Sequence, residues 1–472
     1  MRTTRLIAAV LFSLFFISIL SWKRNTIPDY LPEEAHRYFH PDGAPSAPTA
    51  LDQVIDNLIN GPILTYDESV TLNSETCPTT GVNYDVNAVE GNLQNWREIP
   101  STKISDWRHE IAAFLDSKQG QEKDDKTVYS GRGVVMAAGD RDAVIRARTN
   151  IRFLRSYNCT LPVEIFHFST ELSAPDKQLL EDLSKLEVDG KKDMKVTVRV
   201  VEGISKGTEW KAFQIKGAAI QQSSFDEILY LDTDSYLLRN PESLFSSQHW
   251  RDTGLLLWPD YTKSHPTNPL WRLLGQPCRN EYEGESGQIA ISRTRHREVL
   301  WLVEYFALHH EEFYGFMGGD RDSFRAAALL LGRSWRGPKR LNAAAGVNLD
   351  GFPNGGGHTM LQSDMDGKWM FVHANLIKHS RFPPRPLWAK IHRVKNDKFE
   401  GSSTYGSIDE ANTKLGDGVR LTVDSAPKMV STMEPIEGYD IENRSVVVED
   451  WDTYEELRGF EEKWFGFGGV HY

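Results

Sequence analysis

The chain has 472 residues, of which 40% are hydrophobic, 11% aromatic and 25% charged, with a formal net charge of -12. A chain of this length and composition is globular and can bury a large core, in one big domain or two smaller ones. The negative charge argues against nucleic acid as the main partner, because phosphate binding draws on surplus Lys and Arg.

The amino terminus carries an apolar run, residues 6–22, with basic residues on both sides. We favour an uncleaved membrane anchor over a cleaved signal peptide, since no small-residue cleavage site appears and the bulky Trp22 ends the run. The run is short but suits the thin bilayers of the early secretory pathway. The flanking charges place residues 1–5 in the cytosol and the rest of the chain in the lumen.

The remainder divides into four parts by composition and pattern. A Pro-rich stem or linker is expected at 23–50, a helical extension at 51–127, an α/β domain at 128–394 and a C-terminal extension packed on that domain at 395–472. In the first extension, residues 51–59 and 107–115 are expected to be helices.

From Lys126 onward, strand and helix patterns alternate. Strands are expected at 133–138, 163–168, 196–201 and 228–231, with helices at 141–157, 174–186 and 210–222. Further strands are expected at 254–258, 287–292, 369–374 and 445–448, and helices at 295–312 and 320–331. This alternation predicts a doubly wound, mostly parallel sheet with a Rossmann-like nucleotide-binding half, whose ligands would lie at the carboxyl ends of the strands.

Three cysteines, Cys77, Cys159 and Cys278, allow at most one internal disulfide, and the sequence does not show which two would pair. Asn158 and Asn443 begin N-glycosylation sequons, which are usable only if this part of the chain is lumenal.

Asp232-Thr233-Asp234 ends the expected strand at 228–231. Asp-x-Asp occurs five times in the chain, and most such pairs are solvated loop residues. This pair differs because it follows a buried strand at the edge where α/β sheets bind ligands. Alternation along the strand would put both carboxylates on one side, where they could bind one hard cation such as Mg²⁺ or Mn²⁺.

Other residues could complete a site for a nucleotide-sugar diphosphate. His373 ends an apolar strand and could be a third, neutral metal ligand, although a lone His in that place is more often structural. Lys378, Lys216 and Arg146 could pair with the diphosphate, or could lie on solvated surfaces.

Two polar segments lie next to expected elements. Glu285 and Gln288 precede a strand and are candidates for binding the donor or acceptor sugar. Asp320 and Asp322 follow Gly318-Gly319 before a helix. Asp320 could cap this helix, or it could hold a sugar hydroxyl near the reacting carbon, where glycines would admit the ligand closely.

In order along the chain, these blocks resemble the metal-dependent retaining glycosyltransferases of the GT-A fold. The closer similarity is to fungal α-mannosyltransferases of glycosyltransferase family 71. It rests on FQIKGAAI (213–220), FDEILYLDTDSYLLRNPESLF (225–245), ESGQIAISR (285–293), GGDRDSFRAA (318–327) and FVHANLIK (371–378). The glycogenin-like members of the GT-A group have a late His-x-x-Gly-x-x-Lys motif. In this chain the segment between His373 and Lys378 lacks that glycine and is one residue shorter.

The resemblance implies a type II Golgi membrane protein with a lumenal catalytic domain, GDP-mannose as donor, a mannose-terminated glycan as acceptor, Mn²⁺ as cofactor and retention of the α configuration. Asp232, Asp234 and His373 would then bind the metal, and Asp320 with Asp322 would orient a sugar. The product linkage would be α-1,2 or α-1,3, and a Golgi mannosyltransferase complex is a candidate partner. Two alternatives stay open, which are a metal-independent glycosidase and a noncatalytic carbohydrate-binding scaffold.

Overall fold

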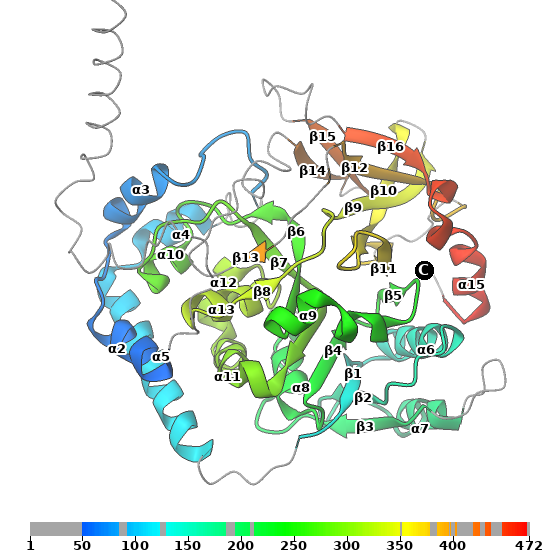
Figure 1. Cartoon of the computed structure of the whole chain (residues 1–472), viewed down its shortest axis with the longest axis horizontal. Coiled ribbons are helices and arrows are strands. Elements are labelled where there is room, and N and C mark those ends of the chain that lie inside the picture. The colour runs from blue at the N-terminus through cyan, green and yellow to red at the C-terminus, as the bar shows by residue number, and fades with distance from the viewer. Residues whose placement is uncertain are drawn as a thin grey trace, which may run out of the picture. The chain divides into compact units, whose positions relative to one another are not determined.

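The computed structural model describes residues 50–84, 92–122, 129–185, 194–207, 212–349, 352–377, 385–395, 397, 402–403, 419–424, 430–435 and 446–469. All of them belong to one compact unit of the chain (Figure 1). The expected cytosolic tail and membrane anchor lie outside these residues, as do Lys378 and Asn443. Within the described ranges, no helix is both long and apolar enough to cross a membrane.

The N-terminal extension is helical, as its pattern predicts. It consists of α2 (Leu51–Asn60), α3 (Tyr66–Ser74), α4 (Asn92–Glu98) and α5 (Ser101–Glu122). Along α5, buried side chains recur every three or four residues, at Ile104, Trp107, Ile111 and Leu115. This spacing forms one apolar stripe, which packs into the same core cluster as the central sheet.

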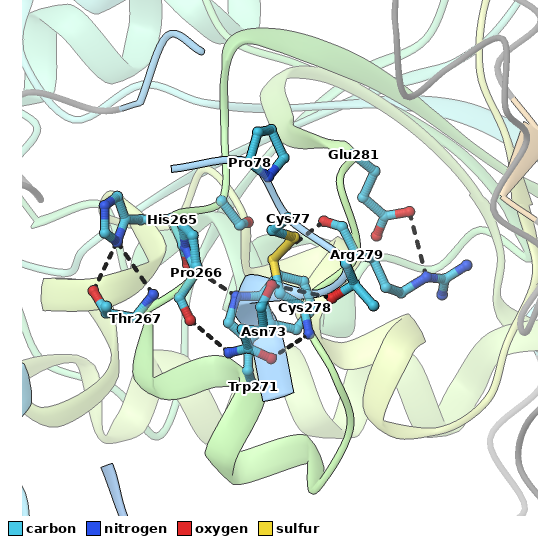
Figure 2. Close-up of a disulfide and its surroundings, with 12 residues drawn as sticks. Asn73, Cys77, Pro78, His265, Pro266, Thr267, Trp271, Cys278, Arg279 and Glu281 are labelled. Atoms are coloured by element: carbon cyan, nitrogen blue, oxygen red, sulfur yellow. Dashed lines mark hydrogen bonds and ion pairs between the residues drawn. A yellow bond between two sulfur atoms is a disulfide. The ribbon is translucent and has the colours of Figure 1, made fainter. Parts of the chain in front are cut away.

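A disulfide between Cys77 and Cys278 joins the extension to the segment that leads into the central sheet (Figure 2). Beside it, the buried Asn73 of α3 donates from Nδ2 to the carbonyl of Pro266 at 2.5 Å and accepts from the backbone N–H of Cys278 at 2.6 Å. Cys159 is the remaining thiol, and it is buried.

The central sheet has the order β13-β8-β6-β7-β4-β1-β2-β3. Its strands are β1 (Arg132–Ala137), β2 (Val163–His167), β3 (Val196–Val200), β4 (Glu227–Leu231), β6 (Leu255–Lys263), β7 (Tyr282–Ser292), β8 (Trp335–Arg336) and β13 (Ser402–Ser403). Strands β1 to β4 are parallel, as predicted. The expectation of a mostly parallel sheet holds, since β6 and β8 run in the same direction as β1 to β4. The exceptions among the described strands are β7, which is antiparallel to both β4 and β6, and the short β13, which is antiparallel to β8.

Helices cover both faces of this sheet. They are α6 (Arg141–Ser156), α7 (Ala174–Glu181), α8 (Ile215–Gln222), α9 (Gln248–Thr253), α10 (Pro269–Leu274), α11 (Arg293–Leu308), α12 (His310–Met317) and α13 (Ser323–Leu330). Successive residues of β4 enter different clusters, Ile228 and Tyr230 with α8 and α11, and Leu229 and Leu231 with α6. The unbroken apolar run of β4 follows from this burial on both sides.

A second sheet was not predicted from the sequence. Its strands are β9 (Ala343–Leu349), β10 (Phe352–Ser363), β12 (Lys390–Val394), β14 (Val419–Asp424), β15 (Val430–Pro435) and β16 (Val446–Asp450), in the order β14-β15-β10-β9-β12-β16. β11 (Trp369–His373) pairs with β10 and with the short β5 (Ser235–Leu237). This last pairing sets His373 opposite Ser235, one residue after Asp234.

The C-terminal helix α15 (Phe460–Gly466) packs on this second sheet, in accord with the packing role expected of the aromatic tail. Trp464 and Phe460 are buried in a cluster with Trp388, which lies just before β12, and with Phe153 of α6. Short 3₁₀ helices occupy Asp182–Lys185, Pro241–Ser246, Trp451–Thr453 and Glu455–Leu457.

Replacing Cys77 or Cys278 by Ser should lower the free energy of unfolding by about 2–5 kcal/mol, because the bond closes a long loop in the unfolded chain. The two cysteines are separated by 201 residues. Chemical denaturation of the oxidised protein and the variants measures the change. Alkylation of the denatured, unreduced protein should label Cys159 alone, and labelling of Cys77 or Cys278 would contradict the pairing.

Candidate active site

Asp232 and Asp234 flank a tight turn that leads from β4 of the central sheet into β5 of the second sheet. The turn is closed by the N–H of Ser235, which donates to the carbonyl of Asp232 at 3.0 Å. The expectation that strand alternation aligns the two carboxylates is therefore wrong, since Asp232 already lies beyond β4. The turn achieves the same outcome and brings both side chains into one cluster.

Two side chains of α6 hold the middle of this turn. Asn150 is buried and donates from Nδ2 to the carbonyl of Thr233 at 2.8 Å. Arg146 donates from Nε to the hydroxyl of Thr233 at 3.3 Å. These residues lie four positions apart on one helix face, so α6 fixes the turn that carries the carboxylates.

Asp232, Asp234 and His373 converge as predicted. Each offers one ligand atom, and these atoms lie within 4.8 Å of one another. Nε2 of His373 is 3.4 Å from Oδ1 of Asp234. Two carboxylate oxygens and one imidazole nitrogen are donors that suit Mn²⁺ or a similar divalent ion, so the residues present fit such a cation.

Lys216 is buried among oxygen atoms beside this trio. Its Nζ lies 2.6 Å from Oδ2 of Asp320, 3.2 Å from Oδ2 of Asp232, and 2.8 Å from both the carbonyl and the hydroxyl of Ser286. Tyr230 completes the group by donating its hydroxyl to Oδ1 of Asp232 at 3.0 Å. The three N–H groups of Lys216 are thus directed at the protein's own oxygens, which differs from the diphosphate contact expected for it.

The charges in this cluster shift one another's pKa values. Burial alone would lower the pKa of Lys216, but Asp232 and Asp320 raise it above its ordinary value. Burial, together with Asp234 and Asp320, raises the pKa of Asp232. Burial opposes the charged form of His373, yet the neighbouring Glu285 and Asp234 raise the pKa of its imidazole to about 10. The metal-free site therefore holds two cationic side chains at neutral pH.

Glu285 and Gln288 both lie within β7, because this strand begins at Tyr282, ahead of the strand expected at 287–292. Both are buried. Oε1 of Glu285 is 3.2 Å from Nδ1 of His373, and its Oε2 accepts from Nε2 of Gln288 at 2.7 Å. The pKa of Glu285 is lowered, since the nearby His373 outweighs the effect of burial. Glu285 and Gln288 thus contact each other and His373, instead of facing a sugar.

Asp320 joins the cluster, whereas Asp322 does not. Gly318 and Gly319 have positive φ values of 64° and 80°, so the chain turns twice before α13 begins at Ser323. The cap position falls to Asp322, so of the two roles left open for Asp320 the helix cap is excluded. Asp320 instead contacts Lys216 and accepts from the Ser286 hydroxyl at 3.1 Å.

The carboxylate of Asp322 is 1% exposed and serves a structural pairing. It accepts from the backbone N–H of Gly284 at 2.7 Å and pairs with the guanidinium of Arg325 at 2.6 Å. A direct role for Asp322 in catalysis remains a prediction that this geometry does not favour.

Sequence reasoning did not single out Asn150, Ser286, Tyr230 or Ser235, all of which contact the cluster. Ser286 could have been found from the sequence, because it stands inside the Glu285–Gln288 block. Asn150 had no signal beyond its place on α6. The expected glycosylation residue Asn158 is exposed and follows α6 at a positive φ of 59°.

Replacing Lys216 by Met should destabilise the fold by about 3–5 kcal/mol, because it leaves two carboxylates without their buried cation. Urea unfolding measures the change. The double variant Lys216→Met/Asp320→Asn should regain part of the loss. Lys103→Met is the matched control, since that lysine forms an ion pair with Glu312 while 38% exposed and should cost about 0–1 kcal/mol. Equal stability of Lys216→Met and the unmodified chain would contradict this reading.

Comparison with known proteins agrees with the resemblance. Residues 131–275 and 272–350 match a family model described as "Mannosyltransferase putative". The alpha-1,2-mannosyltransferase MNN22 of Candida albicans is 27% identical over 284 residues, covering 50% of this chain and 47% of that protein. The alpha-1,2-mannosyltransferase MNN5 of Saccharomyces cerevisiae is 25% identical over 266 residues, covering 44% of each chain.

The chain spans about half the length of the curated relatives it matches. Among solved structures, the apo structure of the bifunctional glycosyltransferase WbbM has a TM-score of 0.31 and 11% identity, covering 43% of this chain and 38% of that one. The matched segments contain the turn at 232–234, Lys216, β7 and Asp320. Residues 131–350 are thus similar to a mannosyltransferase family, and about half of the chain is similar to fungal alpha-1,2-mannosyltransferases.

Proposed function

We propose that the chain is a metal-dependent, retaining α-mannosyltransferase of the GT-A type that transfers mannose from GDP-mannose to a mannose-terminated glycan in the Golgi lumen. The observation that carries the proposal is the convergence of Asp232, Asp234 and His373 within a chain that is similar to a mannosyltransferase family. The names of the relatives favour an α-1,2 linkage over α-1,3.

Mn²⁺ is the proposed cofactor, held by Asp232, Asp234 and His373. When bound, such an ion neutralises charge on the leaving diphosphate without any proton transfer. The cluster has the charge for it, since four carboxylates (Asp232, Asp234, Glu285 and Asp320) face two cationic side chains (Lys216 and His373). When His373 gives up its proton to bind the ion, Lys216 alone balances the four carboxylates, and a divalent ion would offset most of the remaining negative charge.

Side chains of the protein set the relative positions of the groups in the proposed site. Lys216 fixes Asp232 and Asp320 relative to each other through its contacts to both. Asp320 is then placed to orient a hydroxyl of the donor or acceptor sugar. Donor and product are both α, so the acceptor would attack from the leaving-group side and pass its proton to a phosphate oxygen. This route requires no side-chain nucleophile.

Arg146 and Lys378 are the proposed partners of the diphosphate. Arg146 reaches the turn between the two carboxylates, where its charge would lie beside a ligand bound there. The contacts of Lys216 to protein oxygens make it a counter-ion of the site, so the diphosphate would rely on the other two cations.

A lumenal location is supported by the disulfide, because such bonds persist in oxidising compartments. The exposed Asn158 would be available to the glycosylation machinery there, and Asn443 is proposed as a second acceptor. Residues 6–22 are proposed to anchor the chain in the Golgi membrane as a single type II span, and partnership with other Golgi mannosyltransferases is proposed with it.

The glycosidase and scaffold alternatives predict different assays. A glycosidase would keep its activity in EDTA, and a scaffold would bind an oligomannoside without releasing GDP. A donor screen with the full-length chain, Mn²⁺ and a short mannoside, followed by linkage analysis of the product, tests the proposal directly.

Asp232→Ala and Asp234→Ala should each lower mannose transfer at least about a hundredfold, because each removes a proposed ligand of the charge that stabilises the leaving group. Turnover of GDP-mannose with the variants measures this. Asp452→Ala is a matched control, since Asp452 belongs to another Asp-x-Asp pair and is exposed. Unchanged turnover in the first two variants would refute the metal assignment.

The affinity for Mn²⁺ should rise with pH between about 6 and 8.5. The pKa of His373 is raised to about 10, so in this window the metal must displace a proton from the imidazole. One displaced proton corresponds to a gain of about tenfold per pH unit. Calorimetric titration at several pH values measures the slope. His373→Ala should bind Mn²⁺ more weakly and with a smaller slope, and an equal slope in both proteins would count against His373 as a ligand.

A further inference from the structure

We infer that Glu285 is a positioning residue, which holds the imidazole of His373 with Nε2 toward Asp234 and so prepares it to bind the cation. The inference rests on the proposed metal-dependent function and adds to it a residue that sets the geometry of a ligand. It also gives Glu285 a role different from the sugar contact expected from the sequence.

The first support is the placement of the two ring nitrogens. Nδ1 of His373 lies 3.2 Å from Oε1 of Glu285, and Nε2 lies 3.4 Å from Oδ1 of Asp234. The ring therefore bridges two carboxylates through opposite nitrogens. Glu285 lies on the Nδ1 side at ion-pair distance, so a neutral imidazole that carries its proton on Nδ1 would keep its lone pair on Nε2, on the side of Asp234.

The second support is that Glu285 is itself immobilised. Its Oε1 accepts from the backbone N–H of Gly287 at 2.8 Å, and its Oε2 accepts from Nε2 of Gln288 at 2.7 Å. Oε1 of Gln288 in turn accepts from the hydroxyl of Ser235 at 3.2 Å. Ser235 pairs with His373 between β5 and β11, so these contacts form a closed ring of buried groups across three strands.

The third support is the absence of a side chain at residue 287. A Cβ built on Gly287 would lie 2.5 Å from Nδ1 of His373 and 3.0 Å from Oε1 of Glu285. The contact between the imidazole and the carboxylate thus needs glycine at this position. Gly287→Ala should displace the imidazole ring by steric contact, although the substitution removes no polar group from the site.

The experiment compares Mn²⁺ binding by the metal-stripped, full-length protein at one fixed pH. Titration calorimetry gives the dissociation constant. Electron spin-echo modulation of the bound Mn²⁺ reports whether an imidazole nitrogen is coordinated, which a purely structural role of Glu285 would not change. The variants are Glu285→Ala, Glu285→Gln and Gly287→Ala. Glu283→Gln is the control, because Glu283 is buried on the same strand but contacts Thr262 and Arg321.

Glu285→Ala and Gly287→Ala should weaken Mn²⁺ binding by about 10- to 100-fold and lose the nitrogen modulation. Glu285→Gln keeps an acceptor oxygen, so its loss should lie at the lower end of this range, and it decides the question if Glu285→Ala does not fold. Glu283→Gln should bind as the unmodified protein does.

The outcomes distinguish the role of Glu285 from the proposed metal-dependent function. Tight binding with nitrogen modulation in all the variants would overturn the role of Glu285 while leaving the proposed function intact. Failure of the unmodified protein to bind Mn²⁺ at all would overturn both.

Discussion

The buried ammonium of Lys216 is the contact on which the site depends. Asp232, on the turn after β4, and Asp320, ahead of α13, come from segments far apart in the chain, and each is a charge that burial disfavours. A buried cation between them turns this repulsion into attraction, although the desolvation of Lys216 offsets part of the gain. Its further contacts to Ser286 tie β7 to the same point.

The site lies where the two sheets meet. The Asp232–Asp234 turn is the crossing from β4 in the central sheet to β5, which pairs with β11 and thereby joins the second sheet. β7 runs beside β4 and contributes Glu285, Ser286 and Gln288. Both sheets must therefore be formed and docked before the candidate ligands can approach one another.

Much of this arrangement was readable from the sequence, because local pattern determines local structure. The buried run of β4, the parallel strands β1 to β3 and the strand before His373 all follow from their apolar periods. What failed depends on long-range pairing. Hydrophobic pattern does not distinguish an antiparallel neighbour from a parallel one, so the direction of β7 and the entire second sheet were missed.

The side-chain roles show the same division. The residue types of Asp232, Asp234 and His373 predicted that these three side chains would converge, as they do. The partners of Glu285 and Lys216 could be known only once distant strands were placed. The helix-cap role considered for Asp320 is excluded, because two left-handed glycines delay the start of α13. Nor could three cysteines reveal that Cys77 pairs with Cys278.

The pairing of β5 with β11 implies a structural role for the proposed cation, in addition to its catalytic one. Asp232 and Asp234 precede β5, and His373 ends β11, so an ion bound by all three would act as a reversible cross-link between segments that are remote in sequence. Unlike the disulfide, the strength of this cross-link would vary with the concentration of free ion, since a ligand that binds only the folded chain stabilises it by mass action. The supply of divalent metal in the surrounding compartment would then set how firmly the two sheets are held together, as well as how fast the site turns over.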